Sequence, residues 1–289
     1  MAVGYGRGVP SYRYVIADVF TDTPLAGNQL AVFTDARELP ERLMQPLALE
    51  FGFSETVFVL PPEDGGHARI RIFMPGKEVP FAGHPTLGTA FVLAAPMQLG
   101  VIVLETGNGP VPVELERDAS GRIVFGRMSQ PIPTWEPLAE ADALLAALGV
   151  DRAELPVELY DNGMRHAYIA LPTKDAVAAL EPDWAAFGRI GGLCANCFAG
   201  AGASWKTRMF WADDGVGEDA ATGSAAGPLA VHLARHGWIP FGEEIEIEQG
   251  TEIGRPSQLH ARVEGTADGI ERVEVGGSAV VVARGEFRL

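Results

Sequence analysis

Short segments in which apolar and polar residues alternate predict β-strands along much of the chain. Residues 12–20 (YRYVIADVF) are rich in aromatic and β-branched side chains. Residues 67–74 (HARIRIFM) place Arg69 and Arg71 between apolar neighbours, the pattern of a half-buried strand. Further short strands are predicted at residues 101–105, 110–115 and 122–126.

Two helices are predicted among these strands. Residues 36–53 have helical spacing through Leu43, Leu47 and Leu49 and stop at Gly52. Residues 84–95 are apolar or small on every side after Thr86, so we expect protein to enclose this helix all round. Pro85 is expected as its first helical residue, where the missing N–H costs nothing.

A second copy of this order begins after the proline-rich segment 131–137. It consists of a helix at 141–149, a strand at 166–172, a helix at 174–180, a strand at 206–212, a glycine-rich turn and a helix of small residues at 223–237. Residues 71–93 align with residues 208–233, an internal repeat of about half the chain.

The repeat predicts an α+β fold of two pseudo-symmetric domains, each a curled, mostly antiparallel sheet around a central helix. We expect an N-terminal repeat over residues 1–130 and a C-terminal repeat over residues 131–278. The last strand, in residues 279–289, either closes the second copy or crosses back to the first, and the pattern leaves both open.

Composition narrows the class of partner. The 289 residues carry a net charge of -16, and Lys and Arg form no cluster, which argues against nucleic acid or an anionic membrane. Residues 1–20 lack the apolar core of a signal peptide, and no stretch approaches the roughly 20 apolar residues of a membrane span. We therefore expect a cytoplasmic protein.

The candidate chemistry lies at the starts of the two small-residue helices. One helix opens with Gly83-His84 and the other with Gly223-Ser224. A helix N-terminus has unpaired N–H groups and a partial positive charge, so two that converge form an anion pocket without Lys or Arg. The expected ligand is a small molecule with a carboxylate.

Three ionisable residues accompany these helix starts: Glu55, His84 and Asp219. A carboxyl group in an apolar cleft has a raised pKa, as a general acid/base near neutral pH requires. Each residue also has a purely structural interpretation, respectively as a charge at a strand end, a helix cap and a turn residue. Their repeated placement near the two equivalent helix starts favours the proton-transfer interpretation.

Other motifs do not support a metal or cofactor site. The glycines before Gly223 lack the GK[ST] ending of a phosphate loop. Cys194 and Cys197 have C-x-x-C spacing, but no further zinc ligands stand nearby and the surrounding GGLCANCFAG is expected to be a loop, so we predict inert thiols. His232 and His236 lack the HExxH pattern, which favours core and helix-end roles.

Four blocks in this order and at these distances resemble the PhzF-like family of phenazine biosynthesis isomerases: DVFTDTPLAGNQLAVF, FSETVFV, PFAGHPTLGTAFVL and GEDAATGSAAGPLAVHLARHG. The resemblance covers nearly the whole chain and implies a diaminopimelate epimerase-like fold, no cofactor, and a homodimer. In the named family member the reaction converts dihydro-hydroxyanthranilate to its keto form.

By this resemblance Glu55 is the catalytic acid/base, while His84, Asp219 and Ser224 contact substrate or relay protons, and Asn28 lines the cleft. Related amino-acid epimerases carry two opposed cysteines at the helix starts.

This chain has Ala82 and Thr222 there instead, which excludes a two-thiol racemisation. The predicted function is a cofactor-independent isomerase that moves a proton between atoms of a small, cyclic amino or hydroxy carboxylate by one glutamate. The alternative is a non-catalytic protein that binds small carboxylates on the same fold.

Overall fold

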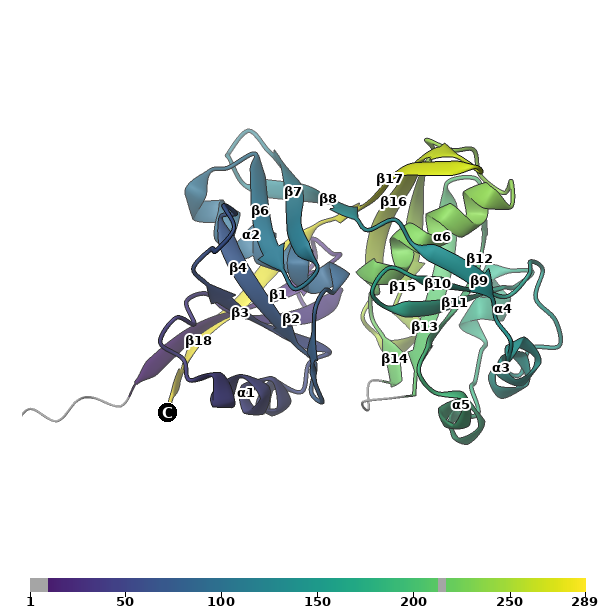
Figure 1. The fold of residues 1–289 in the computed structure, drawn as a ribbon, viewed down its shortest axis with the longest axis horizontal. Coiled ribbons are helices and arrows are strands. Elements are labelled where there is room, and N and C mark those ends of the chain that lie inside the picture. The colour runs from purple at the N-terminus through teal and green to yellow at the C-terminus, as the bar shows by residue number, and fades with distance from the viewer. Residues whose placement is uncertain (1–9, 213–216) are drawn as a thin grey trace, which may run out of the picture.

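The structure, a computed structural model, describes residues 10–212 and 217–289. Residues 213–216, in the predicted glycine-rich turn, lie outside the described residues. Two lobes stand next to each other, and in each of them strands surround one central helix (Figure 1). No helix in the described ranges is long and apolar enough to cross a membrane.

Apart from β18, the two lobes follow the two halves of the chain. The first half comprises β1 (Ser11–Val19), β2 (Asn28–Phe33), α1 (Met44–Phe51), β3 (Glu55–Leu60), β4 (Ala68–Phe73), β5 (Glu78–Val79), α2 (Gly83–Met97), β6 (Val101–Thr106), β7 (Gly109–Arg117) and β8 (Ile123–Gln130). The second half begins with β9 (Thr134–Pro137), α3 (Ala141–Leu148), β10 (Glu158–Asp161), β11 (Arg165–Ala170), α4 (Lys174–Ala178), α5 (Trp184–Ile190) and β12 (Cys194–Ala201). It continues with β13 (Ser204–Trp211), β14 (Gly217–Asp219), α6 (Gly223–Arg235), β15 (Glu244–Gln249), β16 (Ser257–Thr266), β17 (Gly269–Gly277) and β18 (Ala279–Arg288).

The strands form one continuous sheet whose two halves mirror each other in order. From β18 it passes through β1, β2, β3, β4, β6, β7 and β8, and then through β17, β16, β15, β13, β12, β11, β10 and β9. The antiparallel β8–β17 pair joins the halves, from Gln130 opposite Val273 to Gly126 opposite Gly277. β18 pairs with β1 along its whole length, in the lobe of the first half. The domain boundary at residues 130/131 stays a prediction.

The pairing confirms the α+β class and the internal repeat. Four pairs are parallel in the described ladders, namely β2–β3, β4–β6, β11–β12 and β13–β15, and they occupy matching places in the two halves. The other ladders are antiparallel. α2 and α6 follow matching strands and lie inside their sheets.

The helices confirm most of the predicted pattern and correct several details. α1 begins at Met44, after a short 3₁₀ turn at Glu41–Leu43, rather than at residue 36, because Pro40 disfavours a helical conformation in the residue before it. α1 ends where Gly52 adopts a left-handed φ of 64°, as predicted. Leu49 is 64% exposed, because a residue two positions after Leu47 lies on another side of the helix. α2 begins at Gly83 rather than Pro85. Its residues are buried through Phe91, but Ala95 is exposed, so protein encloses this helix only over its first turns and not along its whole length as predicted.

One segment expected to be a loop is a strand. Residues 194–201 form β12, whose first six residues are all buried. Because both faces of this strand are covered, its small residues show no alternation of apolar and polar positions, and the pattern gave no strand signal.

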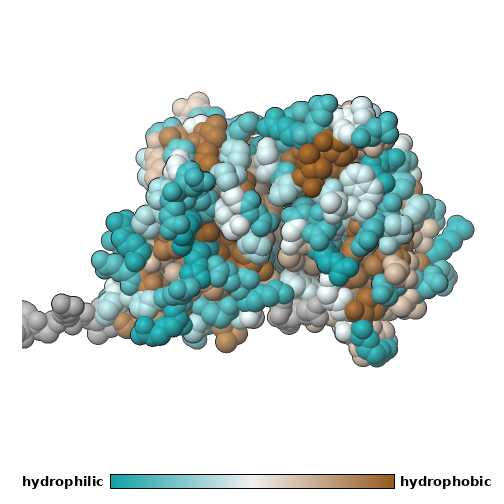
Figure 2. Space-filling view, viewed as in Figure 1, coloured by the Kyte–Doolittle hydropathy of each residue, from teal (hydrophilic) through white to brown (hydrophobic). Residues whose placement is uncertain are grey.

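The core is extensive and lies around α2 and α6. Large side chains such as Tyr168 and Trp205 are almost fully buried there, whereas Phe58 is buried in a separate cluster against α1. On the face drawn in Figure 2 most residues are hydrophilic, and the hydrophobic ones form separate patches. Because the first turns of α2 and α6 are packed in this core, the positions of both helix N-termini are fixed.

Candidate active site

The N-termini of α2 and α6 meet between the two lobes. A side chain at Gly83 would place its Cβ 2.6 Å from the Gly223 carbonyl carbon and 2.7 Å from the Ser224 nitrogen. A Cβ at Gly223 would lie 3.0 Å from the His84 nitrogen. Only glycine permits backbones to approach so closely, so the two glycines explain why the helix starts converge.

Neither helix start is closed by a side chain. The N-cap residues are Ala82 for α2 and Thr222 for α6, and neither side chain accepts a hydrogen bond from its helix. The Thr222 hydroxyl donates to Asp219 Oδ2 at 2.7 Å instead. His84 is therefore not the cap of its helix, and the first amides of both helices lack a partner within their own helix.

Asn28 ties the ionisable residues of the two halves together. Its Nδ2 donates to Asp219 Oδ1 at 2.8 Å and to the Ala221 carbonyl at 2.9 Å, and lies 3.3 Å from His84 Nδ1. Its Oδ1 accepts from the Ser54 hydroxyl at 3.1 Å. Asn28 is buried, and these bonds fix the Asp219 carboxylate where its charge acts on Glu55.

The Glu55 carboxyl holds its proton at neutral pH. Burial raises its pKa to about 8, and the nearby Asp219 carboxylate adds to the rise, while a hydrogen bond with Ser54 opposes it. Burial also raises the pKa of Asp219, but the bonds from Thr222 and Asn28 counter this. Asp219 is thus the better-stabilised anion and Glu55 the better proton carrier near physiological pH.

His84 stands next to this carboxyl as a neutral ring. Its Nε2 lies 3.5 Å from Glu55 Oε2. Burial lowers the pKa of His84 to about 3, against an opposing hydrogen bond with the Gln29 backbone. An uncharged imidazole brings no positive charge to offset the burial of Glu55, which is consistent with the raised pKa of that carboxyl.

A cavity opens at this point with walls from both halves of the chain. The first half contributes Ser54, Glu55, Met74, Val79, Phe81 and Ala82, and the second contributes Met164, His166, Cys194, Met209, Trp211, Asp219, Thr222 and Ser224. Lys and Arg are missing from the described residues that line it. The described lining thus presents hydroxyl and carboxyl groups rather than a cationic side chain.

The predicted site residues come together, but not all reach the cavity. Glu55, Asp219 and Ser224 are among the described residues that line it, whereas Asn28 and His84 are not. Asn28 instead lines an adjoining cavity that shares Ser54 and Asp219 with the first. The ring of His84 faces Glu55. The roles predicted for these residues remain predictions.

The sequence profile described as phenazine biosynthesis-like protein matches residues 17–285. The chain belongs to this family. The trans-2,3-dihydro-3-hydroxyanthranilate isomerase of Pseudomonas fluorescens is 52% identical over 278 residues, which cover 96% of this chain and 100% of the relative. The enzyme of the same name from Pseudomonas aeruginosa is 51% identical with the same coverage. The chain is an isomerase of this family.

Solved structures confirm the fold of the isomerase. A PhzF-family phenazine biosynthesis protein from Bacillus anthracis superposes with a TM-score of 0.84 at 24% identity, over 97% of this chain and 100% of that one. A hydroxyproline epimerase from Agrobacterium vitis reaches 0.67 at 13% identity, over 96% of this chain and 93% of that one. The predicted fold class is therefore correct.

The two cysteines of the isomerase lie on opposite faces of β12. Residues three apart on a strand point to opposite sides, and Cys194 packs in the main core while Cys197 packs in the second apolar cluster, around α3 and α5. The pair can therefore bind neither a common metal nor each other. Burial raises the pKa of Cys197 far above its usual range, as expected of an inert thiol.

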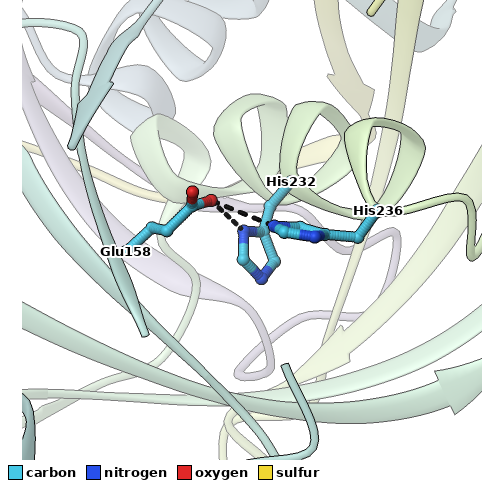
Figure 3. A group of neighbouring side chains, drawn as sticks. All are labelled: Glu158, His232 and His236. Atoms are coloured by element: carbon cyan, nitrogen blue, oxygen red, sulfur yellow. Dashed lines mark hydrogen bonds and ion pairs between the residues drawn. The ribbon is translucent and has the colours of Figure 1, made fainter. Parts of the chain in front are cut away.

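At the C-terminal end of α6 the structure joins His232 and His236, which the sequence had singled out, to Glu158, a partner that the sequence did not indicate. Glu158, His232 and His236 place their ligand atoms within 4.8 Å of one another, the donor set of a metal site (Figure 3). Glu158 Oε2 also accepts from Arg235 Nη1 at 2.8 Å, and the Tyr160 hydroxyl donates to it at 3.0 Å. The guanidinium supplies the positive charge that a metal ion would otherwise bring, so we interpret the cluster as a structural ion-pair network.

Removing the charge of Asp219 is expected to lower the pKa of Glu55. In Asp219→Asn the repulsion between the two carboxylates disappears while burial persists, so the pKa should fall below about 8 yet stay above the ordinary 4.5. The measurement is the pH dependence of kcat/KM, whose midpoint should move to lower pH. The control is Asp22→Asn, an exposed residue, and an unmoved midpoint in Asp219→Asn would contradict the coupling.

Proposed function

We propose that the enzyme isomerises trans-2,3-dihydro-3-hydroxyanthranilate, or a closely related cyclic amino-hydroxy acid, with Glu55 as its single acid/base and without a cofactor. The observation that carries the proposal is the Glu55 carboxyl at the cavity wall, with a pKa of about 8. A general acid/base works best when its pKa lies near the operating pH. Relatives with 51 and 52% identity, named for this reaction, support the substrate class.

The substrate carboxylate binds at the paired helix starts. The first amides of α2 and α6, which no N-cap side chain occupies, and the Ser224 hydroxyl are the proposed donors, and the two helix dipoles favour negative charge there. The substrate ring packs against Phe81, Met209 and Trp211 on the apolar part of the wall. This arrangement suits a small cyclic acid better than a long or cationic ligand.

The reaction is a proton shift without net gain or loss of atoms. Glu55, as a carboxylate, takes a proton from an acidic C–H of the ring, and the C–H electron pair moves into the conjugated system. The same carboxyl then returns the proton to another carbon on that face of the ring, which gives an enol. The hydroxyl proton of this enol then moves to a ring carbon by exchange with solvent, and this second shift gives the keto isomer. Ala82 and Thr222 provide no thiol at the positions used by two-thiol epimerases.

The test is isomer formation in D₂O. Purified enzyme is incubated with trans-2,3-dihydro-3-hydroxyanthranilate and with a pool of other small cyclic amino and hydroxy acids, followed by mass spectrometry and NMR. A new isomer, with or without deuterium on carbon, formed by the wild type but not by Glu55→Gln, supports the proposal. Equal conversion by both proteins would remove Glu55 from the mechanism.

The alternative of a non-catalytic carboxylate-binding protein gives the opposite result in the same experiment. Such a protein would bind members of the pool and convert none of them. A protein that only binds has no need of a buried proton carrier, and the Glu55 environment therefore favours the enzyme. The homodimer and the cytoplasmic location stay predictions from the sequence.

A further inference from the structure

We propose that His166 is a positioning residue that fixes the Ser224 hydroxyl as a hydrogen-bond donor to the substrate carboxylate. His166 is the second residue of β11, is fully buried, and lines the cavity opposite the first half of the chain. Its Nε2 lies 3.1 Å from Ser224 Oγ. The inference rests on the proposed function, because it concerns how that site selects an anion.

The neighbours of His166 decide which of its ring nitrogens carries the proton. His166 Nδ1 lies 3.2 Å from Asn196 Nδ2. The orientation of this amide is set by two backbone carbonyls, because Asn196 Nδ2 also donates to Cys194 O at 3.2 Å and to Ala167 O at 3.4 Å. An amide nitrogen only donates, and its two hydrogens are shared among these three acceptors. His166 Nδ1 therefore faces a donor and carries no proton, so the ring proton is on Nε2.

A proton on His166 Nε2 determines what the Ser224 hydroxyl can do. The ring donates to Ser224 Oγ, and the hydroxyl hydrogen is then directed to another acceptor. The main chain of Ser224 is held separately, since its carbonyl accepts from Asn162 Nδ2 at 2.9 Å. With the hydroxyl on the cavity wall beside the helix start, the acceptor that fits is the anionic group of the substrate.

His166 keeps this arrangement across the working pH range. Burial lowers the pKa of His166 to about 3, so the ring stays neutral while Glu55 titrates near pH 8. A cationic imidazole would lose the bond that Nδ1 accepts from Asn196 and would release the ring. The neutral His166 ring therefore keeps the Ser224 hydroxyl directed at the carboxylate, which is bound without a cationic side chain.

The test compares an anionic with a neutral probe. Binding of 2-aminobenzoate and of 2-aminobenzamide is measured by calorimetry; both are flat rings without an abstractable ring proton, so turnover plays no part. In His166→Asn, whose amide is too short to reach Ser224, affinity for 2-aminobenzoate should fall about ten- to a hundredfold, as expected for a hydrogen bond to a charged group. Affinity for 2-aminobenzamide should change less than threefold.

Three further variants separate positioning from a general packing effect. His166→Gln, whose amide reaches Ser224, should recover most of the 2-aminobenzoate affinity. Adding His166→Asn to Ser224→Ala should cost less than threefold beyond Ser224→Ala alone, because the hydroxyl is already absent. Tyr168→Phe removes another bond to the same helix, at the Ala225 carbonyl, and should leave both affinities unchanged.

Two results would overturn the proposal. One is an equal loss of affinity for both probes in His166→Asn, and the other is a full additional loss in the Ser224→Ala background. If the isomerisation itself failed while the carboxylate preference depended on His166, the proposed reaction would be wrong and the positioning role would stand.

Discussion

Replacing Glu55 with glutamine is expected to lower kcat for trans-2,3-dihydro-3-hydroxyanthranilate by about 10²- to 10⁴-fold, the usual contribution of a general acid/base. The amide matches the carboxyl in volume and leaves the apolar wall intact, so KM should change little. Steady-state kinetics at pH 8, with product followed by absorbance, give both constants.

The control for this substitution is Glu50→Gln, five residues earlier on the exposed side of α1. It should leave kcat and the midpoint of thermal unfolding unchanged. An equal loss in both variants, or a Glu55→Gln enzyme with kcat near the wild-type value, would rule out Glu55 as the proton carrier.

The direction of the wild-type pH profile follows from the same carboxyl. The proposed reaction begins with Glu55 ionised, and its pKa in the free enzyme is about 8. Therefore kcat/KM should rise with pH and level off above about pH 8. A profile that falls through this range would show that Glu55 first donates a proton instead.

Replacing Glu158 with alanine is expected to lower the free energy of unfolding by about 3–5 kcal/mol, the cost of breaking a buried ion pair from one side. Glu158 Oε2 accepts from Arg235 Nη1 at 2.8 Å and contacts His232 and His236. The alanine leaves Arg235 stacked over Trp135 without its counter-ion, in a network that holds β10 to α6. Urea unfolding at pH 7 measures the loss.

The pH dependence of this loss has a defined sign. Burial alone would raise the pKa of Glu158, but hydrogen bonds from His232, His236 and Arg235 outweigh it and hold the pKa well below its ordinary range. The stabilisation is therefore present above the unfolded-state pKa, about 4.3, and is lost as the pH falls towards the folded-state value. The difference between wild type and Glu158→Ala should shrink below about pH 4.

The matched control is Glu286→Gln, which removes an exposed carboxylate paired with Arg288. Solvent screens such a pair, so little change in stability is expected. A Glu158→Ala protein that unfolds at the wild-type urea concentration would show that the network contributes nothing to stability. Kinetic constants near wild type in Glu158→Ala would confirm that the cluster lies outside the chemistry.

The fold was largely predictable because both copies of the repeat have the same local patterns of apolar, polar and small residues. The small-residue helices that begin near Gly83 and Gly223 are recognisable from composition alone, and their equivalence implies that their starts meet. β12 was not predictable, because a strand covered on both faces needs no polar positions. The start of α2 was misplaced by two residues because Pro85 tolerates several positions in a first turn.

The candidate site was predictable only where it lies close to the repeated motif. Glu55, His84 and Asp219 stand near the helix starts, and the structure brings them together. His166 gave no signal, because a single histidine in an apolar strand is usually a core residue and its partner Asn196 lies thirty positions away. Glu158 and His232 are likewise joined across 74 positions by tertiary packing alone.

The pairing of β18 with β1 determines when the sheet of the first lobe can finish folding. β1 lies in the first 20 residues, yet its partner is the last strand described, so the sheet of the first lobe stays open at β1 until the C-terminal strand has left the ribosome. An unpaired β1 exposes backbone donors and acceptors that invite pairing with another chain. Contacts over such sequence separations slow folding, so the first lobe to be synthesised is also the one that finishes last.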